Sequence, residues 1–163
     1  MRARRLALAW SVAAVAVMTG CAGGHGETSI RPTESRDRMK SFVDRSEAAL
    51  GSTGWRDLSG PVIQGCPLGD GRDGFNYGYT RLGPGSEEIA RDVAVMDQFW
   101  RSQGYKTSVV PSSNPNNKTV QVFAVGDAIR TIGLSVDSEY TAFSVESECI
   151  PGDVGQIIEG GDF

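Results

Sequence analysis

The chain has 163 residues, 39% of them hydrophobic, and a formal net charge of −4, which is typical of one globular domain. Its 16 basic side chains are outnumbered by 20 acidic ones, so it lacks the basic surplus with which nucleic-acid-binding proteins contact phosphates. We therefore expect no nucleic-acid partner.

The first 20 residues have the three-part layout of an export signal. Three arginines precede an apolar run over residues 6–17, and the small residues Thr19 and Gly20 stand directly before Cys21. The run is shorter than the roughly 20 residues that a spanning helix needs. This pattern predicts a lipoprotein signal peptide over residues 1–20, with Cys21 as the lipidated first residue of the mature chain. Cleavage as an ordinary secretory signal beside a chance cysteine is the alternative.

A lipid anchor on Cys21 places the protein on the outer face of the cell membrane. A diacylglyceryl group and palmitate supply two or more acyl chains, enough for stable anchoring. Removal of residues 1–20 leaves 13 basic and 20 acidic side chains, a formal charge of −7, which an anionic lipid surface repels. We expect the anchor alone to hold the membrane contact, after export by the general secretory or the twin-arginine route.

A flexible tether and a first helix follow the signal. Residues 21–33 are rich in small and polar side chains and form the predicted tether. The helix begins at Glu34 or Ser35, and Gly51 is a suitable stop. The helical spacing is shown by Met39, Phe42, Val43, Ala49 and Leu50.

Two strands and a second helix come next. Short apolar or aromatic runs predict strands over residues 61–66 and 75–82. Ser86 caps the second helix, which ends at Gly104. Its apolar stripe predicts a core-facing side and consists of Ile89, Val93, Met96 and Trp100.

Four more strands are predicted over residues 105–110, 119–125, 128–136 and 140–149, followed by a loosely ordered tail over residues 151–163. The element order is helix, two strands, helix and four strands. Helices separated by strand pairs usually pack on one face of an antiparallel sheet. The predicted fold class is therefore α+β, a two-layer sandwich formed by a single domain over residues 34–150.

Two cysteines remain beside Cys21, and their export predicts a disulfide between Cys66 and Cys149. A metal pair or two free thiols are the alternatives. A zinc site wants four ligands or a histidine cluster, and His25 in the tether is the only histidine.

Other candidate sites have a simpler structural interpretation. Residues 70–74 faintly suggest a calcium loop, but an arginine at position 72 and the lack of a closing glutamate favour a solvated turn. Glu146 and Glu148 lie on one face of a predicted strand, and two neighbouring carboxylates can carry out acid–base catalysis. The alternative is that they form the solvent-exposed face of that strand. We predict no catalytic, cofactor or metal site, and hence no enzyme.

Phe75, Tyr77 and Tyr79 share one face of the second strand and are the candidate binding surface. Packing in the core is the alternative explanation for these aromatic side chains.

The Met18-Thr19-Gly20-Cys21 junction, the tether and one cysteine pair resemble small lipoproteins of actinobacteria with a domain of uncharacterised function. The resemblance implies lipidation and no particular activity.

We expect a non-enzymatic binding module of the cell envelope, with a protein or cell-wall partner. The alternatives are a carrier or sensor of a small apolar or lipidic ligand, and an envelope hydrolase. A closed apolar cavity under the helices would favour the carrier.

Overall fold

The computed structural model describes residues 30–69, 71–112 and 119–161. The signal peptide and Cys21 lie outside these residues, so the lipidation of Cys21 stays a prediction. The helices are α1 (Pro32–Leu50), α2 (Ile89–Ser102) and α3 (Val154–Gly160). The strands are β1 (Arg56–Pro67), β2 (Asp73–Pro84), β3 (Lys106–Pro111), β4 (Val120–Val125), β5 (Ile129–Val136), β6 (Tyr140–Ser147) and β7 (Ile150–Pro151).

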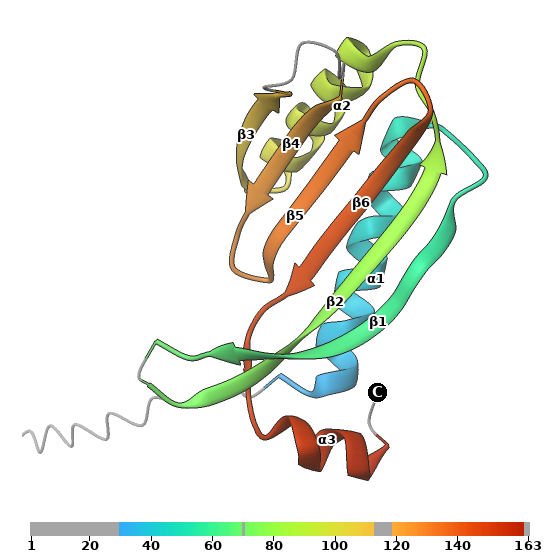
Figure 1. Cartoon of the computed structure of the whole chain (residues 1–163). Coiled ribbons are helices and arrows are strands. Elements are labelled where there is room, and N and C mark those ends of the chain that lie inside the picture. The colour runs from blue at the N-terminus through green and yellow to red at the C-terminus, as the bar shows by residue number, and fades with distance from the viewer. Residues whose placement is uncertain (1–29, 70, 113–118, 162–163) are drawn as a thin grey trace, which may run out of the picture.

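The strands form one seven-stranded sheet in the order β1-β2-β6-β5-β4-β3, with β7 paired to one end of β2. Every strand pair is antiparallel. Helices α1 and α2 lie together on one face of the sheet, and the opposite face is turned to the viewer in Figure 1. This arrangement confirms the predicted α+β sandwich. None of the described helices is both long and apolar enough to cross a membrane.

Helix α1 begins at Pro32, two or three residues before the predicted start at Glu34 or Ser35. Proline suits the first turn of a helix because its missing N–H needs no partner there. The helix ends as predicted at Gly51, whose φ of 72° lies in the left-handed region and whose N–H donates to the carbonyls of Glu47 and Ala48.

The stripe on α2 packs into the core between the helices and the sheet. Trp100 is fully buried, and its indole N–H donates to the Ser46 hydroxyl of α1 at 3.0 Å. Its ring lies 6.3 Å from the ring of Phe143 on β6. The predicted core role of Trp100 is therefore confirmed, and this residue ties both helices to the middle of the sheet.

The tail differs from the loosely ordered segment that the sequence predicts. It contains β7 and the short helix α3, whose first turn is capped by Asp153 through an N–H bond from Gln156 at 3.0 Å. Val154 and Ile157 pack against the core, and α3 contacts β1. The segment is rich in glycine and acidic residues, which is why a loosely ordered tail was predicted. That prediction overlooked these two apolar side chains, which pack the tail against the core.

Candidate functional site

Cys66 and Cys149 form the predicted disulfide, with their Cα atoms 6.1 Å apart. Cys66 lies near the end of β1, and Cys149 lies between β6 and β7. The bond therefore fixes the far end of the β1–β2 hairpin to the segment that leads into α3. Its place in the framework indicates a structural role.

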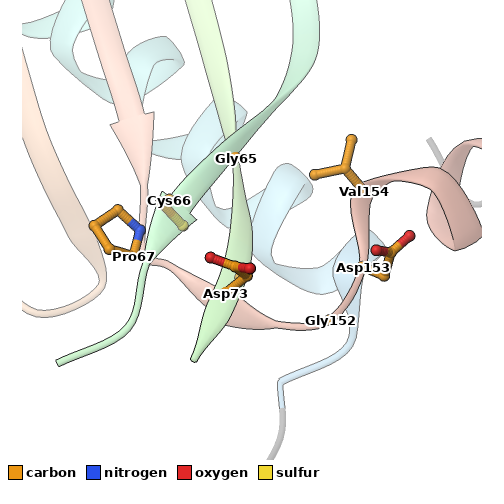
Figure 2. A pocket seen from close by; sticks show the side chains of 8 residues that line it. Gly65, Cys66, Pro67, Asp73, Gly152, Asp153 and Val154 are labelled. Carbon is orange, nitrogen blue, oxygen red and sulfur yellow. The ribbon is translucent and has the colours of Figure 1, made fainter. Parts of the chain in front are cut away.

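A hollow of about 430 Å³ opens beside this disulfide (Figure 2). It is lined by the ends of β1 and β2 and by the turn into α3, with Asp73 and Asp153 as its acidic side chains. Asp153 already accepts the capping bond of α3. The described residues contain no group of three or more potential metal ligands. The calcium-loop hypothesis thus gains no support from Asp73, while Asp70 lies outside the described residues.

The candidate binding surface at Phe75, Tyr77 and Tyr79 was predicted wrongly. These side chains are 0%, 0% and 3% exposed, because the face of β2 that they share lies under α1. The same alternation that suggested an exposed aromatic strip marks the buried side of a strand at the interior of the sheet. Their role is core packing.

A polar network closes the edge of this core beside Tyr79. The Arg81 guanidinium donates to both carboxylate oxygens of Glu47, at 2.7 and 3.1 Å, and to Asp57 at 2.5 Å. Tyr79 donates its hydroxyl proton to the same Asp57 oxygen at 2.7 Å. One arginine on β2 thereby joins α1 to β1.

The network shifts the pKa values of Asp57 and Tyr79. Hydrogen bonding to Arg81 and then to Tyr79 lowers the pKa of Asp57. Burial, and secondly the bond to Asp57, raises the pKa of Tyr79 to about 12. The carboxylates of Glu47 and Asp57 both accept hydrogen bonds from Arg81, so the cluster braces α1 against β1 and β2.

The two glutamates considered for acid–base work are separated. Glu146 lies on β6 in register with Gly78 of β2. Glu148 lies beyond the end of β6, and its carboxylate accepts a 3.5 Å hydrogen bond from Arg38 of α1. The carboxylate of Glu148 is thus bonded to helix α1, whereas Glu146 lies on β6. The structure does not bring the two carboxylates into one site.

The face of the sheet opposite α1 and α2 is the candidate functional surface. Residues directly opposite on antiparallel strands point to the same side, and the strand registers define rows across all six main strands. One row is Val110, Gln121, Ser135, Ala142, Leu82 and Arg56. The next is Ser108, Phe123, Gly133, Ser144, Thr80 and Ser59. We call these two rows the open face.

The open face is poor in charge. Most of its side chains are small or carry a hydroxyl, and Arg56 at one end is its charged member. The Phe123 ring covers Gly133, where an added Cβ would lie 3.2 Å from two ring carbons. Gln121 donates to the Ser135 hydroxyl at 3.1 Å. These contacts hold the side chains of Phe123 and Gln121 against neighbouring residues of the sheet.

Exposed apolar side chains gather at the β3–β4 side of this face. Val110, Phe123 and Val125 are 44%, 37% and 49% exposed. The strand register places Val125 opposite Lys106, next to the row that contains Phe123. A group of neighbouring apolar side chains exposed on one face is typical of an interaction site.

The sequence contained only part of the signal for this surface. Alternation over residues 140–149 predicts a wet strand face that includes Ser144. That Ser144 lies in one row with Phe123 and Thr80 depends on strand order and register, which the alternation does not give.

The space between the sheet and its two helices is filled with large side chains. Those that are fully buried include Met39, Tyr77, Met96, Trp100, Ile132, Leu134 and Phe143. Large, fully buried side chains are typical of a close-packed protein interior.

Comparison with known proteins places the fold. No protein-family model matches the sequence, and no curated protein matches it. A crystal structure of a DUF4853 family protein from Actinomyces odontolyticus ATCC 17982 is similar, with a TM-score of 0.53 and 15% sequence identity. The similarity covers 75% of this chain and 67% of that chain. At this identity the comparison shows a shared fold, with an actinobacterial domain of unknown function.

Proposed function

We propose that this protein is a membrane-anchored, non-enzymatic binding module of the cell envelope, and that its open face docks a protein partner. The observation that carries the proposal is the pair of charge-poor rows across the sheet, next to the exposed apolar side chains of Val110, Phe123 and Val125. The lipid anchor on Cys21 is the predicted means of attachment.

The chemistry of the open face supports a protein partner. The core of a protein interface is depleted in charge and contains apolar or aromatic side chains, and a polar rim surrounds it. Here Phe123 lies among serine, glycine and threonine, while Lys106 and Arg56 stand at the two ends of the sheet. Six strands at the usual spacing and two rows of side chains give an area of roughly 400 Å², about half of the roughly 800 Å² per partner of a standard interface.

The filled core argues against the carrier of a small apolar ligand. A ligand chamber under α1 and α2 would need the volume that Trp100, Tyr77 and Phe143 occupy, and each of these side chains is fully buried. The hollow beside the disulfide offers two carboxylates and no nucleophile among its lining residues, which gives little support to an envelope hydrolase.

Photo-crosslinking in intact cells tests the proposal. A photoreactive amino acid is placed at Ser144 in the centre of the open face, and separately at Phe123. The matched control position is Asp44, which is exposed on α1 in the helical layer. We expect the same protein to be captured from Ser144 and Phe123 and not from Asp44.

A blocking variant adds the second arm. Ser144→Arg sets a long charged side chain in the centre of the open face and leaves the core untouched. It should abolish capture from Phe123 and weaken binding of the purified, identified partner by about tenfold or more, with the melting temperature unchanged. Capture from Asp44 alone, capture of wall glycan in place of protein, or unchanged binding by Ser144→Arg would each contradict the proposal.

A further inference from the structure

The two edge strands of the sheet, β1 and β3, differ in how regularly they pair with their neighbours and in what covers them. At one edge, the pairing of β1 with β2 has register shifts between Asp57 and Ser59 and between Ser59 and Val62, and α3 contacts the strand. At the other edge, β3 pairs with β4 through residue after residue without a shift. Irregular pairing and covering elements protect an edge from further strands, whereas a regular edge invites them.

The direction of each backbone group on β3 follows from one hydrogen bond. Ser112 N–H donates to Thr119 carbonyl at 3.0 Å, so this opposite pair is a hydrogen-bonded one. Hydrogen-bonded and non-hydrogen-bonded pairs alternate along an antiparallel ladder. The backbone groups of Ser108 and Val110 therefore point to β4, and those of Thr107, Val109 and Pro111 point away from the sheet.

The outward-pointing backbone groups of Thr107, Val109 and Pro111 can pair with the same groups of a second copy, with Val109 at the centre of the pairing. We infer that β3 is a homotypic docking edge, at which β3 of a second copy of this chain adds antiparallel and continues the sheet. Val109 then exchanges both backbone bonds with Val109 of the second copy, and Thr107 N–H donates to the Pro111 carbonyl of that copy. Pro111 has no N–H, so the return bond from Pro111 to the Thr107 carbonyl is the one that this register lacks.

The side chains suit the same register. Val109 and Val110 are each 44% exposed, so the pairing buries apolar surface that water now contacts. Val109 meets its own copy, and Val110 meets Ser108 of the second copy on the other side of the sheet. The charged side chain of β3, Lys106, falls opposite Ser112 of the second copy, so no like charges face each other.

The arrangement adds to the proposed function without depending on it. Antiparallel edge pairing keeps the same face of both sheets on one side, so the two open faces lie next to each other and the helices share the opposite side. A short strand pair buries less than the roughly 800 Å² per partner of a standard interface, which makes the dimer weak in solution. A common tether to a membrane raises its effective concentration.

The test uses the full lipidated chain in lipid vesicles and in detergent, with Val109→Pro as the decisive variant. Proline at this position removes an outward donor and leaves the bonds from β3 to β4 intact. Val109→Thr is the matched control, because it keeps the backbone donor and lowers the apolar character. Sedimentation equilibrium should show wild type and Val109→Thr approaching twice the monomer mass as concentration rises. Val109→Pro should weaken the dimer by about tenfold or more.

A second measurement does not depend on how well the proline variant folds. Val109→Cys in the full chain should crosslink to itself with a short bifunctional thiol reagent, while Leu58→Cys, which is 59% exposed on β1, should not. A chain that stays monomeric on vesicles, a dimer unaffected by Val109→Pro, or no crosslink from Val109→Cys would overturn the inference. Partner capture from Ser144 in a monomeric chain would leave the proposed function standing, so the two failures are distinguishable.

Discussion

At the scale of single residues, Trp100 contributes most visibly to the core. It is fully buried, its ring contacts the sheet through Phe143, and its indole N–H bonds to Ser46. Ser46 in turn donates to the Phe42 carbonyl at 2.9 Å. One side chain thus links the two helices to each other and to the sheet.

Trp100→Ala should lower the free energy of unfolding by about 3–5 kcal/mol, because it leaves a large cavity in a packed core. That is a large part of the 5–15 kcal/mol typical of a domain, so the melting temperature and the yield should fall sharply. Urea unfolding measures the loss. Glu146→Gln, on the side of β6 away from the core, is the control and should change stability by about 0.5 kcal/mol or less. An unchanged melting temperature for Trp100→Ala would mean that the α2 stripe faces solvent.

Tyr79 makes stability depend on pH in the alkaline range. Its pKa is raised to about 12 in the folded protein, against about 10 when unfolded. Above pH 10 the unfolded chain loses the phenol proton and the folded chain retains it, so stability falls as pH rises from 10 to 12. The loss attributable to Tyr79 is on the order of 2–3 kcal/mol.

Tyr79→Phe should therefore be less stable than wild type at pH 8, by about 1 kcal/mol for the lost bond to Asp57, and should lose less stability between pH 10 and 12. Urea unfolding of both proteins across this range measures the two slopes. Parallel slopes would show that Tyr79 ionises at its ordinary pKa in the folded state.

At the scale of elements, the disulfide and α3 hold one end of the molecule. The Cys66–Cys149 bond closes a loop with a sequence separation of 83 residues. It ties β1 to the segment that leads through β7 into α3, while Val154 and Ile157 pack against the core. The hairpin of β1 and β2 extends past the rest of the sheet at this end, as Figure 1 shows, where β7 and α3 are the elements that contact it.

Replacement of both cysteines, Cys66→Ala with Cys149→Ala, should cost about 4–5 kcal/mol if the chain-entropy estimate for such a loop applies. Thermal unfolding followed by circular dichroism measures it, and wild type under strong reductant should shift in the same direction. Thiol counting on the exported wild-type protein under denaturing, non-reducing conditions should find neither cysteine free. Two reactive thiols, or a melting temperature indifferent to both treatments, would contradict the structural role.

At the scale of the whole molecule, the proposed function joins an anchor at one terminus to a binding face on the sheet. Cys21 lies outside the described residues, and only nine positions separate it from Ile30, where the described structure begins. A chain of that length reaches at most about 30 Å. The domain is therefore held close to the membrane surface if Cys21 is lipidated.

Cys21→Ala should abolish lipidation, because neither of the other cysteines follows an apolar signal. Metabolic labelling with a fatty-acid probe tests it, and the mutant protein should lose the label and leave the membrane fraction. Label retained by Cys21→Ala would show that another residue is acylated, and the proposed localisation would have to be abandoned.

The sequence by itself determined most of the local elements, with β7 and α3 as the exceptions. Helical periodicity predicted α1 and α2. Glycine at position 51 predicted the end of α1, and its backbone is left-handed there. Alternation predicted the later strands, and a turn that includes Gly126 and Asp127 joins β4 to β5. These features depend on residues a few positions apart, so a single sequence contains their signal. The two cysteines beside Cys21, together with the predicted export signal, likewise predicted the Cys66–Cys149 bond.

Only the tertiary structure decided which faces are buried and which are open. Phe75, Tyr77 and Tyr79 were assigned to a surface, and α1 covers them. Ser108, Phe123 and Ser144 are distant in sequence, and strand order places them in one row. The outward backbone groups of β3 depend on its place at the edge of the sheet. Burial and exposure of this kind arise from pairing between distant segments, and alternation within one strand tells its two faces apart without saying which of them a helix will cover.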